Sequence, residues 1–234
     1  MPHFVEKGML QGNVPLDSAW NYYYGQKPRS FGEHSGYYEH IIRTMASRYP
    51  SILDISQIKT LVLGGFHPFN GTPEDFKNFC FRIHPNPSII YLDMNRLPLE
   101  AASGGHAVQA RVEYLPFQPS VIDFLFLDFT VDYMNDEELK RLSHSSSVSL
   151  SPNGLMIIAK TFPPGLKKMQ RDHPQLTLHP RYISELITTM ANLKLVMLSL
   201  GYDSSLVIMA REDSPFEPHT PSPSDLSEEY PWPK

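Results

Sequence analysis

The stretch VIDFLFLDFTVDYMNDEELKRLSHSSSVSLSPNGLMIIAK, residues 121–160, decides the fold of this chain. It predicts a buried strand over residues 122–129, an acid-started helix, a turn and a second buried strand over residues 155–159. Two nearly continuous apolar runs separated by a helix are typical of a parallel sheet covered on both faces. Because ligands bind outside the carboxyl ends of such strands, we expect chemistry beside residues 128–133 and 160–164.

Composition bounds the class of protein. The chain has 234 residues, of which 41% are hydrophobic, enough for one substantial core. A formal net charge of −5 argues against a protein held mainly by nucleic-acid phosphates. The single cysteine, Cys80, suits a reducing compartment. No apolar run resembles a secretory signal or a bilayer span, so we expect a cytoplasmic protein that binds neither nucleic acid nor membrane.

The chain divides by composition into an arm, a domain and a tail. Residues 1–36 are broken by glycine and proline yet rich in aromatic residues, which favours an irregular N-terminal arm or lid. Residues 37–212 alternate apolar runs with amphipathic segments, which predicts one α/β domain. Residues 213–234 are rich in proline, serine and acid, which predicts a tail without a core of its own.

Within the domain, helices and strands are expected to alternate. Helical spacing of apolar residues predicts helices over residues 38–49 and 183–190, and Thr72 with Pro73 predicts the start of another. Apolar runs predict strands over residues 59–66, 88–93, 110–115, 122–129, 155–159, 194–200 and 206–211. The order predicts a doubly wound, mostly parallel sheet with helices on both faces and a C-terminal antiparallel hairpin.

Several local turns fit one known family. Gly64 and Gly65 follow the first strand, the segment 115–117 (Leu-Pro-Phe) follows the third, and the turn 152–154 (Pro-Asn-Gly) precedes the fifth. Together with the order of elements, these features resemble the class I S-adenosylmethionine-dependent methyltransferases, which have a Rossmann-like fold. The resemblance implies S-adenosyl-L-methionine as cofactor, S-adenosyl-L-homocysteine as product and a small aromatic or hydrophobic molecule as methyl acceptor. It leaves a homodimer open.

The resemblance also implies which residues bind the cofactor. Gly64 and Gly65 would let the backbone approach its methionine part, although an ordinary tight turn also uses glycine. Asp93, which ends the second strand, would accept hydrogen bonds from the ribose hydroxyls, with a turn cap as the alternative. The other candidate cofactor contacts are Met94, Val112, Glu113, Asp128 and Phe129.

The chain departs from the family pattern at two positions. Val62 and Leu63 are apolar where the family has an acid near the end of the first strand. Arg111 stands where the family has an acid for the adenine amino group. These departures keep a second interpretation open, in which the protein has the methyltransferase fold but acts as a binding or scaffold protein.

Two other classes of cofactor are disfavoured. No G-x-G-x-x-G motif follows the first strand, which argues against an NAD(P)-dependent oxidoreductase. None of the ten histidines forms a pair such as H-E-x-x-H, so we expect no metal.

Residues 126–133 (FLDFTVDY) face the methyl group if the resemblance holds. Methyl transfer needs an acceptor held in line more than it needs a strong base. The candidate catalytic residues are Asp132 and Tyr133, although Asp132 equally suits the acid of a helix N-terminus. For a hydroxyl acceptor, Asp132, His34 or His67 could act as general base. The candidate substrate-binding residues are Tyr23, Tyr24, Tyr38, Thr130 and Phe162.

The aromatic segment at residues 20–24 predicts a lid over the substrate. Lids come from the least stable parts of a structure, and their closure excludes water from the reacting centre. We therefore expect limited proteolysis near Lys27 and Arg29 to slow when S-adenosylhomocysteine is bound. An arm packed permanently on the sheet edge would be cut at the same rate in both states.

Overall fold

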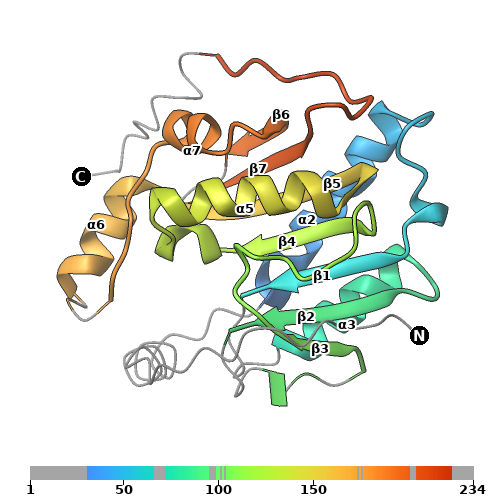
Figure 1. The fold of residues 1–234 in the computed structure, drawn as a ribbon, viewed down its shortest axis with the longest axis horizontal. Helices are drawn as coiled ribbons and strands as arrows, with labels where there is room; N and C mark the ends of the chain where they lie inside the picture. The colour runs from blue at the N-terminus through green and yellow to red at the C-terminus, as the bar shows by residue number, and fades with distance from the viewer. Residues whose placement is uncertain are drawn as a thin grey trace.

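Figure 1 shows the fold of the chain in a computed structural model. The structure describes residues 31–65, 72–94, 99–100, 102, 104–172, 174, 176–200 and 204–222. Its strands are β1 (Thr60–Gly64), β2 (Ser88–Asp93), β3 (His106–Gln109), β4 (Ile122–Asp128), β5 (Leu150–Thr161), β6 (Leu193–Leu200) and β7 (Ser204–Arg211). Its helices are α2 (Phe31–Arg48), α3 (Thr72–Ile83), α5 (Asp136–Ser149), α6 (Pro163–Asp172) and α7 (Ile183–Thr189), with short 3-10 helices η1 (Ile55–Gln57) and η2 (Thr130–Tyr133). None of these described helices has the length and apolar composition needed to cross a membrane.

The strands form one 7-stranded sheet in the order β3-β2-β1-β4-β5-β7-β6. Every pair of neighbouring strands among β1 to β5 is parallel. Strand β7 runs antiparallel to both β5 and β6. The prediction of a doubly wound, mostly parallel sheet that ends in an antiparallel hairpin is therefore confirmed.

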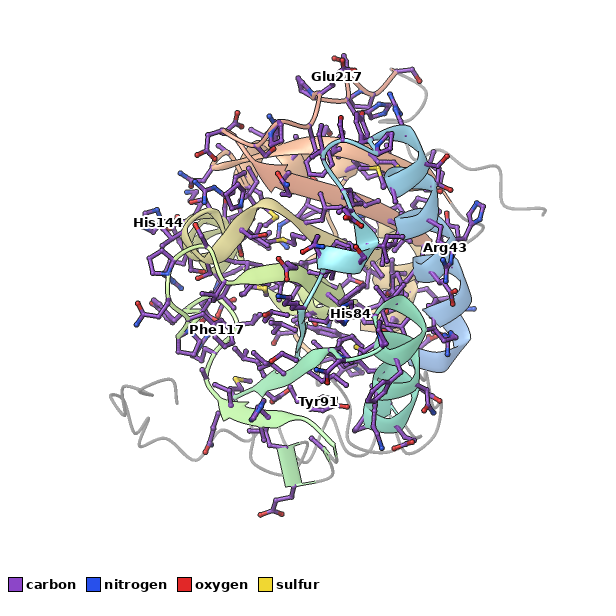
Figure 2. The ribbon with its side chains drawn as sticks, turned by 90° about the vertical axis from the view of Figure 1, so that its right-hand side faces the viewer. Arg43, His84, Tyr91, Phe117, His144 and Glu217 are labelled. Carbon is purple, nitrogen blue, oxygen red and sulfur yellow. The ribbon has the colours of Figure 1, made fainter. Side chains whose placement is uncertain are left out.

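Helices cover both faces of the sheet because successive side chains of each strand point to opposite sides. In β4, Phe124 and Phe126 join the apolar cluster that α2 and α3 cover, whereas Leu125 joins the cluster that α5 and α7 cover. All three side chains are fully buried. Figure 2 shows the result, with Arg43 of α2 and His144 of α5 on opposite sides of the sheet.

Helix α2 begins at Phe31, inside the segment that the sequence predicted to be irregular. The Phe31 ring is fully buried and meets Phe76 and Phe79 of α3 edge to face, with centroids 5.1 and 5.4 Å away. It also meets Phe126 of β4 at 6.0 Å. Aromatic pairs of this geometry add to the free energy gained by burial. The ring cluster therefore holds the start of α2 on the sheet, which helical periodicity alone did not reveal.

The prediction of a third strand over residues 110–115 was wrong. Strand β3 is His106–Gln109, which pairs with β2, and the loop that follows it occupies the predicted range. The loop turns where the Tyr114 N–H donates to the Arg111 carbonyl oxygen at 3.0 Å. A short edge strand with exposed side chains has little apolar pattern, and so the sequence signal fell on the apolar residues after it.

The deciding stretch folds as expected, with one difference. The Asn135 side chain caps α5 by accepting the Glu138 N–H at 3.0 Å, and the Glu138 carboxylate accepts the Asn135 N–H at 2.8 Å. Strand β5 begins at Leu150, earlier than predicted. The expected turn is a bulge inside β5, where the register with β4 shifts after Ile122.

The start of the predicted tail packs on the domain. Phe216 is 2% exposed and its ring meets Tyr49 of α2 edge to face at 5.4 Å. The Lys194 ammonium donates to the Ser214 carbonyl oxygen at 2.6 Å, and the His219 N–H donates to the Leu195 carbonyl oxygen at 2.8 Å. One buried ring and a few bonds to the edge of β6 therefore dock a segment whose composition predicted no core.

Replacing Phe216 by alanine should lower the stability of the whole domain. A buried phenylalanine truncated to alanine typically costs about 3–5 kcal/mol, because apolar contact is lost and a cavity remains. We expect the free energy of unfolding in urea to fall by about 3 kcal/mol. The adjacent exposed Glu217→Ala, labelled in Figure 2, is the control and should change little. Equal stability of the two variants would show that docking of Phe216 contributes nothing.

Candidate functional site

The carboxyl ends of the parallel strands meet along one edge of the sheet. We call it the carboxyl edge, marked by Gly64 of β1, Asp93 of β2, Asp128 of β4 and Thr161 of β5. From β1 the chain goes first to β2 on one side and later to β4 on the other. The direction of winding thus reverses between β1 and β4, and ligands of open α/β sheets bind outside such a reversal point.

Both predicted glycines lie in a tightly packed turn after β1. Gly65 has φ +68°, a conformation that glycine adopts readily, and its N–H donates to the Leu92 carbonyl oxygen at 2.8 Å. A Cβ atom on Gly65 would lie 2.7 Å from Thr130 Cγ2, and one on Gly64 would lie 2.8 Å from Val112 Cγ2. The glycines therefore let three segments of the chain converge at the carboxyl edge.

Asp93 and Met94 lie one strand away from this turn. Gly64 pairs with Leu92, so the residue that ends β2 stands directly beyond the glycine turn. Asp93 is 7% exposed, whereas Met94 next to it is 37% exposed. The Gln109 side-chain amide donates to the Met94 carbonyl oxygen at 3.2 Å, which ties this corner to β3. The structure thus brings together a buried acid, an exposed thioether and the glycine turn.

The loop after β3 carries a paired acid. Glu113 is buried, and its carboxylate accepts a hydrogen bond from the Arg111 guanidinium. The same guanidinium donates to Glu138 of α5 at 2.6 Å. Burial alone would lower the pKa of Arg111, but the two acids more than offset this and raise it. Arg111, a departure from the family pattern, therefore neutralises Glu113 and fixes the backbone of Val112 between them.

Strand β4 ends in a left-handed residue. Phe129 has φ 59° and ψ 8°, which is uncommon for a residue with a large side chain. Its N–H donates to the Ala159 carbonyl oxygen of β5 at 3.0 Å. Its buried ring meets the His34 ring of α2 edge to face at 5.4 Å. Strained conformations of this kind persist only where the surroundings hold them, and they cluster at functional sites.

The short helix η2 follows this kink and joins three parts of the edge. The Thr130 hydroxyl lies 2.9 Å from the Gly64 carbonyl oxygen and 3.0 Å from that of Gly65. The Asp132 carboxylate accepts the Thr161 N–H at 3.0 Å, and the Asp132 carbonyl oxygen accepts the His179 N–H at 2.8 Å. Asp132 is 2% exposed. Its carboxylate thus holds the exit of β5 in place.

Tyr133 and Phe162 are the other predicted residues of this corner. Tyr133 is half-buried and packs on the cluster of Leu166 and Leu178 beside α6. Phe162 is buried at the start of the same helix.

Tyr38 brings helix α2 to the site. It is 1% exposed, and its hydroxyl donates to the Asp128 carboxylate at the end of β4. Burial, and then the charge and hydrogen bonding of Asp128, raise the pKa of Tyr38 well above its usual value. Tyr38 therefore remains a donor, and it was predicted as a substrate-binding residue without any sign of its partner.

Lys160 is the residue that sequence reasoning missed. It is 1% exposed near the end of β5, and its ammonium donates to the Thr161 carbonyl oxygen at 3.2 Å. Asp132 binds the N–H of the same residue, so two buried charges hold Thr161 from both of its backbone groups. The sequence did contain one signal, a single lysine at the end of an apolar run. Buried charges are nearly always paired, so a lysine in that position indicates a partner nearby.

A hollow of about 600 Å³ lies on the α7 side of this corner. His179 in its wall is joined to η2 through Asp132, and burial, followed by Arg181, lowers the pKa of His179. The hollow is lined by Asp136, Leu178, His179, Pro180, Arg181, Ser184, Glu185, Thr188 and Thr189. None of these lining residues is among the site residues that the sequence predicted. The candidate site is therefore the carboxyl edge, where the predicted residues meet. The predicted residues Tyr23, Tyr24 and His67 lie outside the described residues.

Comparison with known proteins gives structures but no sequence relatives. No protein-family model matches the chain, and no curated protein matches it. The PH0226 protein from Pyrococcus horikoshii OT3 is similar at TM-score 0.60 and 12% identity, over 82% of this chain and 99% of that one. Mitomycin 7-O-methyltransferase MmcR is similar at TM-score 0.55 and 13% identity, over 85% of this chain and 69% of that one. Geranyl diphosphate C-methyltransferase from Streptomyces coelicolor A3(2) is similar at TM-score 0.51 and 11% identity, over 71% and 77%.

At these identities the likeness shows the fold alone. The strand order, the closing hairpin and the solved structures agree, and the chain has the class I S-adenosylmethionine-dependent methyltransferase fold.

Replacing Tyr38 by phenylalanine tests the buried contact between α2 and β4. Hydrogen bonds to charged groups contribute about 1.5–3 kcal/mol, so the free energy of unfolding at neutral pH should fall by about that amount. The raised pKa of Tyr38 adds a pH dependence. The unfolded chain releases the Tyr38 proton near pH 10 and the native chain does not, so the wild type should lose stability above about pH 10. The difference between the two proteins should then narrow.

Urea unfolding at neutral pH and above pH 10 measures both effects. Tyr37→Phe on the same helix is the matched control, because Tyr37 is exposed and its hydroxyl bonds the uncharged Ser199 hydroxyl. It should change stability by less than about 1 kcal/mol, as solvent-exposed groups do. A Tyr38→Phe difference that stays constant with pH would contradict the contact.

Proposed function

We propose that this protein binds S-adenosylmethionine across the carboxyl edge and transfers its methyl group to a small aromatic or hydrophobic acceptor. One observation carries the proposal. The sheet brings the glycine turn after β1, Asp93 of β2 and the left-handed Phe129 that follows β4 to the point where its winding reverses.

The residues at this edge fit the cofactor. The Asp93 carboxylate would accept hydrogen bonds from the two ribose hydroxyls, and ionised acceptors form the stronger bonds of this kind. Met94 is exposed, and its thioether would pack on the adenine. The backbone of Gly64 and Gly65 would lie against the methionine part, and Val112 packs against Gly64 at the same corner. We therefore assign these five residues to the cofactor.

The acceptor would lie over the end of β4. S-adenosylmethionine supplies an activated methyl group, and the protein must hold the acceptor in line with it and exclude water. Phe129 and the η2 helix would form the nearest part of the wall, and Tyr38 holds the end of β4 behind them through Asp128. Aromatic side chains at and below this corner favour an aromatic or hydrophobic acceptor.

A second candidate function is cofactor binding without methyl transfer. The specific observation in its favour is that Asp132, the predicted catalytic acid, is buried and bound to the Thr161 N–H. A protein of this kind would bind S-adenosylhomocysteine and S-adenosylmethionine but would transfer no label from radioactive S-adenosylmethionine to any hydroxyl, amine or thiol acceptor.

The first test of the proposal is binding of S-adenosylhomocysteine, measured by calorimetry and by the melting temperature of the protein. NAD is the comparison ligand. A ligand that binds only the native state stabilises it by about 2.7 kcal/mol at a hundredfold excess over its dissociation constant. A rise in melting temperature with S-adenosylhomocysteine and none with NAD would support the proposal. Absence of binding at millimolar concentration would overturn it.

Asp93→Ala should weaken binding of S-adenosylhomocysteine. Loss of hydrogen bonds to a charged group costs about 1.5–3 kcal/mol, which corresponds to about 10- to 150-fold in the dissociation constant. Asp213→Ala, which removes an exposed acid paired with Arg211, is the control and should bind normally. Melting temperatures establish that both variants fold. An unchanged dissociation constant for folded Asp93→Ala would mean that Asp93 only shapes the turn after β2.

A further inference from the structure

His34 lies on helix α2 at the carboxyl edge of the sheet. Its ring meets Phe129 edge to face at 5.4 Å, and the ring of Tyr38, one turn later in the helix, is centred 6.5 Å away. Tyr38 in turn binds Asp128 at the end of β4. The histidine is therefore placed beside the kink over which the methyl acceptor is proposed to bind.

The Nδ1 atom of His34 is buried and, among the described residues, has no hydrogen-bond partner. A buried polar atom without a partner costs stability, and native proteins contain few such atoms. Such an atom calls for an explanation, and a catalytic role is one of those that native proteins provide. An imidazole nitrogen without a partner is also the usual proton acceptor near neutral pH.

The acids of the same corner already have partners. The Asp128 carboxylate accepts the Tyr38 hydroxyl, and the Asp132 carboxylate accepts the Thr161 N–H. Glu113 is paired with Arg111. Each of these carboxylates holds a structural contact that proton uptake would weaken. Proton transfer through His34 would break none of these contacts.

We infer that His34 is the general base of the reaction and that the methyl acceptor is a hydroxyl compound, a phenol in the first instance; this rests on the proposed function. The acceptor oxygen attacks the methyl carbon, the O–C bond forms and the C–S bond breaks, and the electron pair remains on sulfur. The acceptor proton passes to His34 Nδ1. The products are the methyl ether, neutral S-adenosylhomocysteine and an imidazolium at His34.

Several titratable groups lie at the same corner as His34. They include Tyr38 on the same helix, Asp128 at the end of β4, Asp132 and Tyr133 in η2, and the buried cation Lys160 near the end of β5. A hydroxyl acceptor needs such a base, because its oxygen becomes a strong nucleophile only as the proton leaves.

Histidine side-chain NMR on the full chain tests the inference without requiring turnover. The protein is labelled with ¹⁵N-histidine and saturated with S-adenosylhomocysteine, and 2-naphthol or catechol is then added. The His34 signals, assigned with His34→Gln, should move, and those of exposed His40 on the same helix should not. If neither 2-naphthol nor catechol shifts the His34 signals at millimolar concentration, the inference is overturned. Failure of S-adenosylhomocysteine to bind at all overturns the proposed function instead.

Rates of methyl transfer to the same phenols give a second measurement. General base catalysis contributes about 10²- to 10⁴-fold, so His34→Gln should lower kcat by at least about 100-fold. Its dissociation constant for S-adenosylhomocysteine should stay within about twofold of wild type, because the cofactor contacts lie elsewhere. His40→Gln is the matched control and should retain full activity. A His34→Gln protein with the wild-type kcat overturns the inference.

Discussion

The hydrogen bonds of η2 are the interaction on which the site depends. Phe129 turns the chain at the end of β4, and η2 then binds the turn of β1 through Thr130 and the exit of β5 through Asp132. Its backbone also holds the segment before α7 through His179. The turn after β1, the exit of β5 and the segment before α7 are thus all bound to one short helix. A reaction that requires in-line geometry gains from such fixed positions more than from additional charge.

Charge pairing explains why a site with so many acids can be so deeply packed. Lys160 and Asp132 bind the two backbone groups of Thr161, and Arg111 neutralises Glu113. Buried charges are tolerated only with such partners, and removing one partner leaves the other uncompensated. The acids of the corner consequently act on its geometry. This arrangement also accounts for the missing family acid, because Arg111 in its place serves the loop after β3.

The sequence could predict the sheet because apolar runs depend on burial that is local to each strand. The range predicted for β2 matches the structure, and the acids in the first turn of α5 marked the start of that helix. The third strand was misplaced because an exposed edge strand leaves no apolar signal. The contact of Tyr38 with Asp128 joins residues 90 positions apart, and no local pattern encodes such a contact. The sequence also could not tell whether Asp132 is a catalytic acid or a buried structural one, because an acid at the start of a helical turn fits either role.

Helix α2 connects the site to the opposite end of the sheet. Its first turns carry His34 and Tyr38 to the carboxyl edge, and Tyr49 just beyond its end meets Phe216 from the segment after β7. The helix is held between these contacts by the ring cluster around Phe31. Close packing makes such a helix move as a unit or not at all. The position of the His34 ring at the site is therefore set by the same aromatic core that gives the domain its stability.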